Sequence, residues 1–210
     1  KGVRRRPTAM IKPTLRSDLT LGKTDGTRRA AAAIHCDMST SFSDRPGIQI
    51  CGIASAVPEY CIDQAMMRDI VLATAPEFRS HETLFHNTGV KTRFSCVPVE
   101  WFLGAQGWSS RANVFRTAAV KLLEDVSRQC ADRAGIALSD VEAIVTVSTT
   151  GLAVPSLDAI LANRLGLPAA VERLPIFGLG CAGGVSGLAR SGRLAQSLPA
   201  GNVLLLVVEL

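Results

Sequence analysis

The sequence predicts an α/β fold organised around a sheet that is buried on both faces. Segments of strand character alternate along the chain with segments of helical periodicity, which is the order expected of such folds. Ala143–Ser148 is a run rich in apolar and β-branched residues, and such runs are typical of strands covered on both faces. With 210 residues, 47% of them hydrophobic and 20% charged, the chain is long and apolar enough to form a substantial core.

The expected elements follow one another from Gly47 onward. Gly47–Val57 is predicted to be a strand, which Pro58 ends. A long helix after the loop at Gly104–Ser110 should be capped by Ser109 or Ser110 and should end at Gly135. Its expected buried stripe is Val114, Ala118, Leu122, Val126 and Cys130. The other predicted helices are Asp63–Thr74, a second helix that ends at Gly89, Ser156–Leu165 and Ala182–Gln196. The other predicted strands are Ala143–Ser148, Val171–Phe177 and Asn202–Leu210.

Positive charge is concentrated in residues 1–46. This stretch holds ten Lys and Arg against four Asp, a net of +6, whereas residues 47–210 have a net charge of −1. It shows no sustained apolar periodicity, so we predict a disordered basic extension over 1–46 and a folded domain over 47–210. A nucleic-acid-binding patch is disfavoured because no aromatic residue lies among the basic ones before Phe42. A transit peptide is disfavoured by Asp18 and Asp25.

Several other classes of protein are excluded by composition. The longest aliphatic run near the end, Val203–Val208, is far shorter than the roughly 20 residues that span a bilayer. The six cysteines are widely spaced and contain no C-x-x-C pair, which fits a reduced cytoplasmic protein better than a disulfide scaffold or a zinc site. His81 and His86 are five residues apart and lie on different faces of a helix, so no metal site is predicted.

The most informative segment is the glycine-rich turn of Leu174–Arg190, for which two chemistries compete. Gly178, Gly180 and Gly183 match the G-x-G-x-x-G pattern of dinucleotide-binding turns. Alternatively, Cys181 lies where a strand turns into a helix, and a helix N-terminus carries roughly half a positive charge, which favours thiolate over thiol. The second reading makes Cys181 an acyl acceptor.

Three details favour the nucleophile over the dinucleotide site. Pro175 lies in the preceding strand, where a central strand of a dinucleotide-binding fold disfavours it. The strand, glycine-rich turn and helix around Cys181 come late in the chain, after several other elements. A cysteine also has no role at the tip of a phosphate-binding loop. A buried, inert cysteine in a close-packed glycine turn remains the alternative on the local pattern alone.

These residues carry a family resemblance. G-L-G-C-A-G-G-V-S-G-L-A-R around Cys181, V-S-T-T-G-L-A-V-P-S-L-D over Val147–Asp158 and V-L-L-L-V-V-E-L at the end resemble the bacterial type III polyketide synthases, relatives of chalcone and stilbene synthases in the thiolase superfamily. The likeness runs from about Gln49 to Leu210. It implies the N-terminal half of a thiolase-like fold, a mixed five-stranded sheet with helices on both faces, truncated before the second half.

The resemblance also implies roles for individual residues. Cys181 matches the nucleophile that takes the starter acyl group from coenzyme A. Thr149 and Thr150 match positions that line the cavity beside it, although capping of the strand end explains them equally well. Val154 matches the residue that reaches the neighbouring subunit's cavity in a homodimer. Glu209 is assigned as a hydrogen-bonded carboxylate that borders the cavity. Lys91 and Arg93 are assigned to the region near the mouth of the coenzyme A tunnel; the alternative is that they belong to a solvated face.

The implied reaction condenses a starter acyl-CoA with malonyl-CoA and uses no cofactor. The family takes a catalytic His and Asn from its second half, and none of the histidines here lies in a matching motif. Because the chain stops in a hydrophobic strand, we expect it to be incomplete and not to condense malonyl units alone. The alternatives are a β-ketoacyl-acyl-carrier-protein synthase III, whose usual A-C-A-G-F differs at Gly180 and Gly184, a non-catalytic dinucleotide-binding domain, and a structural dimerisation half.

Overall fold

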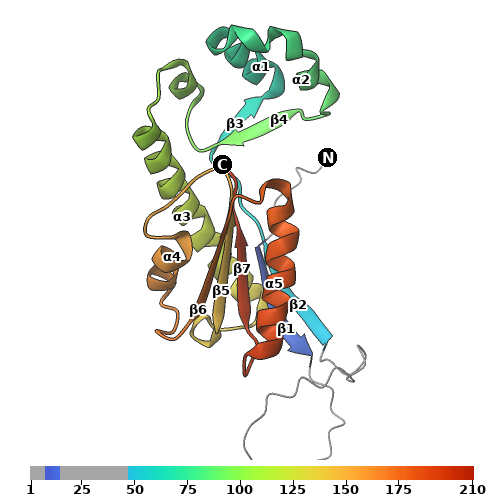
Figure 1. The fold of residues 1–210 in the computed structure, drawn as a ribbon, viewed down its shortest axis with the longest axis vertical. Coiled ribbons are helices and arrows are strands. Elements are labelled where there is room, and N and C mark those ends of the chain that lie inside the picture. Colours follow the sequence, from blue (N-terminus) through green and yellow to red (C-terminus); the bar gives the residue numbers. More distant parts are fainter. Residues whose placement is uncertain (1–7, 15–46) are drawn as a thin grey trace, which may run out of the picture.

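The computed structural model describes residues 8–14 and 47–210. A five-stranded sheet with the order β2-β1-β7-β5-β6 forms its centre (Figure 1). Its strands are β1 (Thr8–Thr14), β2 (Gly47–Ala54), β5 (Ala143–Ser148), β6 (Glu172–Phe177) and β7 (Val203–Val207). β5 pairs in parallel with β6 and with β7, whereas β1 is antiparallel to both β2 and β7. The predicted α/β fold with a mixed five-stranded sheet is therefore confirmed.

Helices cover both faces of this sheet. α3 (Trp108–Ala134) and α4 (Leu157–Leu165) lie on one face, and α5 (Gly183–Ser197) lies on the other (Figure 1). Along β7, Leu204 and Leu206 pack with the α3 and α4 side, while Val203 and Leu205 pack with the α5 side. This division follows from the alternation of side chains along a strand. All six residues of β5 are buried, which confirms the prediction of a strand covered on both faces.

A smaller lobe lies next to the carboxyl ends of β5, β6 and β7 (Figure 1). It contains an antiparallel pair of strands, β3 (Tyr60–Asp63) and β4 (Thr92–Ser95), with helices α1 (Gln64–Thr74) and α2 (Thr83–Asn87). The Asp63 carboxylate caps α1 by accepting a hydrogen bond from Ala65 N at 2.8 Å. Short 3-10 turns complete the chain at Pro76–His81, Val99–Leu103, Leu138–Asp140 and Gly180–Ala182. β3 and β4 were not predicted, because four-residue strands are too short to show a period.

The long helix α3 differs from its prediction at its start and in its buried face. Its N-cap is Gly107 rather than Ser109 or Ser110, although Gly135 ends it in a left-handed conformation as predicted. Val126 and Cys130 are buried as expected, but the N-terminal part of the predicted stripe is only half-buried. Phe115, Ala119 and Leu123, each one position later, are buried instead, together with Val120. The stripe was misplaced because alanines and valines surround the helix in this part, and the apolar period is ambiguous.

Strand β1 corrects the prediction of a disordered extension. Residues 1–46 were expected to lack regular structure, and this is wrong for Thr8–Thr14, which form a strand between β2 and β7. Ala9, Met10 and Ile11 are buried, with exposed fractions of at most 5%. Three apolar residues followed by Lys12 and Pro13 are too short a signal for a periodicity argument. The remainder of the predicted extension, residues 1–7 and 15–46, lies outside the described residues.

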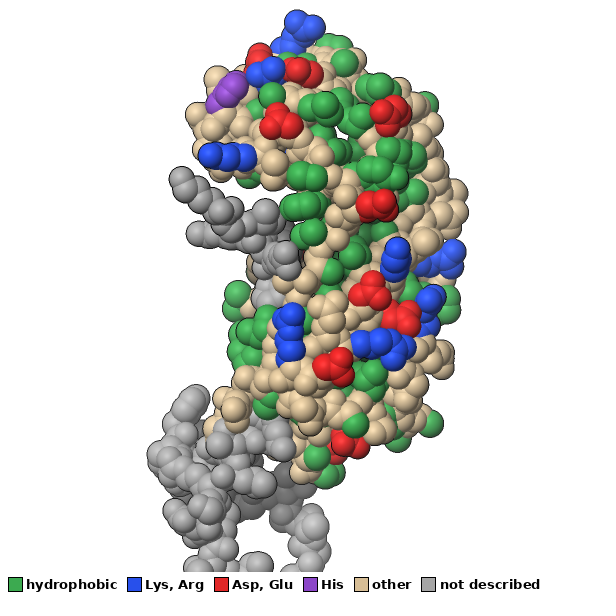
Figure 2. Space-filling model, turned by 180° about the vertical axis from the view of Figure 1, so that it is seen from behind, with side chains coloured by type: hydrophobic (Ala, Val, Ile, Leu, Met, Phe, Trp, Pro, Cys, Tyr) green, Lys and Arg blue, Asp and Glu red, His purple; other side chains and the backbone are tan. Residues whose placement is uncertain are grey.

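The surface seen from behind mixes charges of both signs. Lys and Arg side chains are interspersed with Asp and Glu over the lower part of this face, and hydrophobic side chains lie between them (Figure 2). Among the described helices, none combines the length and the apolar character that crossing a membrane requires.

Candidate active site

Cys181 lies in the turn that joins β6 to α5. Gly180–Ala182 form a single 3-10 turn that runs directly into α5, so Cys181 precedes the first helical residue by two positions. Its side chain is exposed. A helix N-terminus is the positive end of the helix dipole, and an anionic sulfur is stabilised there. The structure thus presents this thiol at the position where the sequence predicted the nucleophile.

Glycines give this turn its shape. Gly178 and Gly180 have φ angles of +82° and +54°, in the left-handed region that other residues rarely adopt. Gly183 serves a different purpose, since a Cβ there would lie 2.7 Å from Val147 Cγ1. The first two glycines therefore reverse the chain after β6, and the third lets α5 pack closely on β5.

The other described cysteines are less suited to act as nucleophiles. Cys130 is buried between α3 and β2, where its Sγ donates to Gly52 O at 3.4 Å. Burial raises the pKa of the Cys130 thiol and also that of the Cys96 thiol. Cys61 is exposed, but it lies on β3 in the small lobe. Of the described thiols, Cys181 is therefore the exposed one in a turn that runs directly into a helix.

Three of the predicted site residues gather around the Cys181 turn. Thr149 and Thr150 follow β5, and their backbone N–H groups donate to Glu209 Oε2 at 3.1 and 2.9 Å. The Thr149 hydroxyl accepts a hydrogen bond from Gly180 N at 3.0 Å, next to Cys181. The Thr150 hydroxyl accepts from Leu210 N at 3.0 Å. Glu209 follows β7, so this cluster joins the carboxyl ends of β5, β6 and β7.

Val154 belongs to the loop between β5 and α4. Its side chain is 91% exposed, and the Val154–Pro155 peptide bond is cis. The same loop contains a contact that the sequence did not predict. A Cβ on Gly151 would overlap the Phe115 ring, so glycine is required where the loop crosses α3. Trp108, Arg111 and Leu152 line a small hollow beside that crossing.

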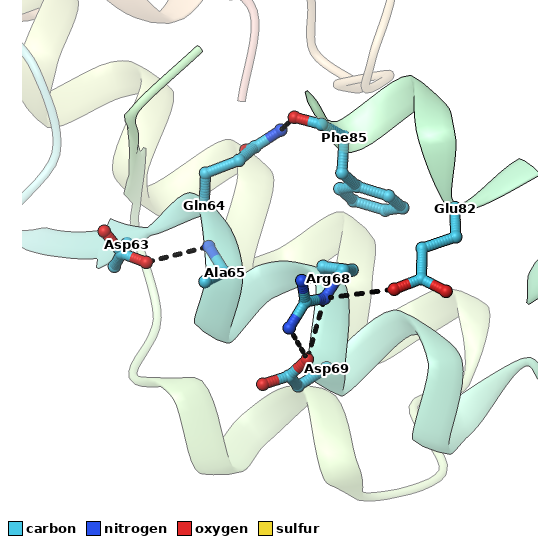
Figure 3. A network of polar contacts seen from close by, with 7 residues as sticks. All are labelled: Asp63, Gln64, Ala65, Arg68, Asp69, Glu82 and Phe85. Carbon is cyan, nitrogen blue, oxygen red and sulfur yellow. Dashed lines mark hydrogen bonds and ion pairs between the residues drawn. The ribbon is translucent and has the colours of Figure 1, made fainter. Parts of the chain in front are cut away.

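Lys91 and Arg93 lie in the small lobe rather than at the Cys181 turn. Arg93, on β4, donates from Nε to Gln64 Oε1 at 2.8 Å, and the Gln64 side chain donates in turn to Phe85 O at 3.2 Å. Figure 3 shows this glutamine above the α1 cluster in which Arg68 pairs with Asp69 and Glu82. The hydrogen bond to Asp69 raises the pKa of the Arg68 guanidinium. Arg93 is thus engaged in holding the lobe together, whereas Lys91 lines an open hollow with Arg68 and His86.

The geometry around α5 also bears on the glycine pattern. β6 and β7, the strands before and after α5, are separated in the sheet by β5. In a dinucleotide-binding half domain, the strands joined by the glycine turn and its helix are neighbours. In the part of the chain that the structure describes, no group of three or more His, Cys, Asp and Glu residues could hold a metal ion.

The fold and this turn define a class of protein, the α/β proteins that present a cysteine at the carboxyl edge of a mixed sheet. Residues 37–210 match the family model described as chalcone and stilbene synthases, N-terminal domain. The chain therefore belongs to the chalcone and stilbene synthase family, which includes the type III polyketide synthases. The match begins at residue 37, so strand β1 lies outside it.

Relatives of this chain are known in several bacteria. It is 33% identical over 168 residues to 1,3,6,8-tetrahydroxynaphthalene synthase of Streptomyces peucetius subsp. caesius, covering 78% of this chain and 45% of the relative. It is 30% identical over 155 residues to phloroglucinol synthase of Pseudomonas fluorescens, covering 72% and 44%. The crystal structure of 1,3,6,8-tetrahydroxynaphthalene synthase from Streptomyces coelicolor, a bacterial type III polyketide synthase, superposes with a TM-score of 0.67 at 30% identity over 72% of this chain and 44% of that one. The chain thus spans about half the length of the relatives it matches.

Proposed function

We propose that this chain carries the nucleophile of an acyltransferase that condenses a starter acyl-CoA with malonyl-CoA units. The observation that carries the proposal is the exposed Cys181 in the turn before α5, within a chain of the type III polyketide synthase family. Membership in the family supports polyketide synthesis as the activity. The exposed sulfur at a helix start supports Cys181 as the acyl acceptor.

The proposed reaction has three stages. The Cys181 thiolate attacks the carbonyl carbon of the starter thioester, a new carbon–sulfur bond forms, and coenzyme A leaves as a thiolate that takes up a proton. Malonyl-CoA then loses carbon dioxide, and the electron pair of the broken bond becomes an enolate. The enolate carbon attacks the acyl group on Cys181, which releases the cysteine thiolate and leaves a chain two carbons longer on coenzyme A. Decarboxylation itself supplies the carbon nucleophile, so the proposal includes no metal or other cofactor.

The remaining assignments belong to the same proposal. Coenzyme A thioesters are the proposed partners, and Lys91 is the better candidate for a contact near the tunnel mouth, because the Arg93 side chain is occupied by Gln64. The 91% exposed Val154 is proposed to reach a second copy in a homodimer. For Thr150, whose hydroxyl accepts a hydrogen bond from Leu210 N, we propose the capping role and not a place in the acyl cavity. We also propose a cytoplasmic location, where a reducing environment keeps a nucleophilic thiol reduced.

The test is to detect the acyl-enzyme directly. The full chain is incubated with an acyl-CoA, and peptide mass spectrometry locates the acyl group. We expect the acyl mass on the peptide containing Cys181, none in Cys181→Ser at the same position, and protection of Cys181 from iodoacetamide by the acyl-CoA. Acylation of another cysteine, or an unchanged acylation level in Cys181→Ser, would refute the nucleophile assignment.

A second experiment identifies the extender. Product is measured in an enzyme that joins this chain to the second half of a type III polyketide synthase, with malonyl-CoA and, separately, with malonyl-acyl-carrier protein. We expect polyketide when malonyl-CoA is the extender and no carrier protein is present. Condensation that requires the carrier protein would instead indicate a β-ketoacyl synthase. Stabilisation by NAD against thermal unfolding, without acylation, would indicate a dinucleotide-binding domain.

A further inference from the structure

Four hydrogen bonds tie together three chain segments that lie far apart in the sequence. The Glu209 carboxylate accepts from the backbone N–H groups of Thr149 and Thr150 through the same oxygen, Oε2. The Thr149 hydroxyl then accepts from Gly180 N at 3.0 Å, and the Thr150 hydroxyl accepts from Leu210 N at 3.0 Å. The cluster thus runs from the end of β7, through the end of β5, to the turn that bears Cys181.

The bond between Thr149 and Gly180 is directed at the backbone beside the nucleophile. Gly180 has a φ of +54°, and its N–H belongs to the peptide group that joins Leu179 to Gly180, one residue before Cys181. On either side, the turn is held by backbone bonds, from Gly178 N to Ser148 O at 3.2 Å and from Ala182 N to Leu179 O at 3.1 Å. The Thr149 hydroxyl is therefore the side-chain group that fixes the peptide between these two anchors, next to Cys181.

Glu209 holds Thr149 in the orientation that this bond needs. A carboxylate that accepts two neighbouring backbone N–H groups forms charge-assisted hydrogen bonds, which are stronger and more directional than neutral ones. Because Glu209 is half-buried, these bonds are partly shielded from water. The segment after β5 is thereby fixed relative to β7, and the Thr149 hydroxyl is held toward the turn.

We infer that Thr149 and Glu209 are positioning residues for Cys181, acting through the backbone of the turn rather than by contact with the substrate. The inference rests on the proposed function, in which Cys181 is the nucleophile. It also changes the assignment that the resemblance implies, since the Thr149 hydroxyl and Glu209 Oε2 both accept hydrogen bonds from backbone N–H groups. Displacing a reacting group by about 1 Å costs up to roughly 10²-fold in rate, so loss of these bonds should be measurable.

Thr150 provides a matched comparison. It is the same residue type at the next position, and its backbone N–H is held by the same carboxylate oxygen. Its hydroxyl, however, is bonded to Leu210 N and not to the turn. Thr149→Val and Thr150→Val remove equivalent hydroxyls from the same loop, but only the first removes a bond to the Cys181 turn.

The test measures the second-order rate of Cys181 alkylation by iodoacetamide in the full chain, resolved by peptide mass spectrometry. We expect Thr149→Val to slow the reaction about tenfold or more. In Thr149→Ser, which keeps the hydroxyl, the alkylation rate of Cys181 should lie within about threefold of the rate in the unmodified protein. In Thr150→Val it should lie within about twofold, because the bond to the turn is kept. The exposed Cys61 in the small lobe is the internal reference, and its rate should not change. An equal rate in Thr149→Val and the unmodified protein would overturn the inference.

Steady-state kinetics with acyl-CoA, in an enzyme that joins this chain to the second half of a type III polyketide synthase, separate positioning from substrate contact. In Thr149→Val, and in Glu209→Leu, kcat should fall while KM for the acyl-CoA stays within about twofold, because a positioning residue does not bind the substrate. A raised KM with normal Cys181 alkylation would overturn the inference and assign Thr149 to the cavity. If Thr149→Val does not fold, as judged by circular dichroism, Thr149→Ala removes the same hydroxyl and carries the test. Alkylation needs no acyl-CoA, so failure of the proposed function would appear as absent acylation while the alkylation comparison still decides the positioning role.

Discussion

The interior of the sheet and its carboxyl edge are built by the same strands, but they are held together by different forces. In β5, all six residues are buried, and apolar side chains pack on both faces. One residue later, Thr149 is half-buried and Thr150 is exposed, and hydrogen bonds to Glu209 hold this segment in place. Along β7, the buried Leu204–Leu206 likewise give way to the half-buried Glu209.

This difference separates stability from chemistry. Apolar burial is non-directional and scales with the area removed from water, so the interior contributes to the free energy of unfolding. Hydrogen bonds depend on geometry, so the edge fixes the orientation of particular groups. Substitutions at the edge should therefore change reactivity with little effect on stability, and substitutions in the interior should do the opposite.

The largest expected effect is that of Cys181→Ala on activity. If Cys181 is the acyl acceptor, its removal from an enzyme that joins this chain to the second half of a type III polyketide synthase should lower polyketide formation on the order of 10⁴-fold or more, as the loss of a covalent nucleophile does in other enzymes. Because the side chain is exposed, the melting temperature should stay the same. Product formation by liquid chromatography and thermal melting measure the two quantities. Retained activity would contradict the role of Cys181 as nucleophile. A melting temperature lower by several degrees would contradict the expectation that edge residues contribute little to stability.

The converse experiment is Leu206→Ala in the interior. Leu206 on β7 is fully buried in the core on the α3 and α4 side. Removing its side chain should lower the free energy of unfolding by about 2–5 kcal/mol, measured by urea denaturation. Leu103→Ala is the control, because Leu103 is 60% exposed, and its effect should be within about 0.5 kcal/mol. Equal losses in the two variants would show that burial does not decide the effect.

The sequence predicted the interior better than the edge, for a physical reason. β5 and α4 were predicted closely because burial leaves a composition that can be seen within the segment itself. The reactive cysteine was also found, because the glycines that shape its turn are adjacent to it. Strand β1 was missed because three apolar residues reveal no period and its pairing partners lie far along the chain.

The contacts of the edge residues could not be predicted from local pattern. Thr149 and Glu209 are 60 positions apart, and Thr149 and Gly180 are 31 apart. No local signal reveals that the hydroxyl of Thr149 faces the turn while that of Thr150 faces Leu210. The same holds for Arg93, whose partner Gln64 is 29 positions away. These contacts between side chains and backbone groups are determined by the order of the strands in the sheet.

A smaller effect is expected from Gly187→Ala, at the contact of α5 with the sheet. A Cβ there would lie 2.7 Å from Val147 Cγ2 and 3.0 Å from Leu205 Cδ1, so the helix must shift. We expect a loss of about 1–3 kcal/mol in the free energy of unfolding, because overpacking costs this much. The loss should be smaller in a Val147→Ala background, as a double-mutant cycle by urea denaturation would measure.

Gly184→Ala is the matched control on the same helix. Nothing lies within 4 Å of a Cβ at Gly184, so no overpacking is expected. Alanine also favours a helix over glycine by up to about 1 kcal/mol, so this variant should be neutral or slightly more stable. If both variants lost stability equally, close packing would not be the reason for glycine at position 187.

The smallest expected effect concerns Glu124, outside both the interior and the edge. Its carboxylate accepts from Arg128 Nη2 at 3.0 Å and from Arg164 Nε at 2.7 Å, and so links α3 to α4. The hydrogen bond from Arg128, followed by that from Arg164, lowers the pKa of the Glu124 carboxyl. A carboxyl whose pKa is lowered in the folded state stabilises the fold at pH values above its unfolded-state pKa of about 4.3, and this stabilisation is lost as pH falls through the folded value.

Glu124→Gln should therefore lower the melting temperature slightly at pH 7, and the difference from the unmodified protein should disappear in acid. The pairs are partly exposed to solvent, so the difference should also shrink as salt is added. Melting curves at several pH values and two salt concentrations measure both trends. Asp125→Asn removes a charge from the exposed neighbouring position, which makes no ion pair among the described residues, and should leave the melting temperature unchanged. A Glu124→Gln difference that persists in acid would show that the side chain acts by packing and not by its charge.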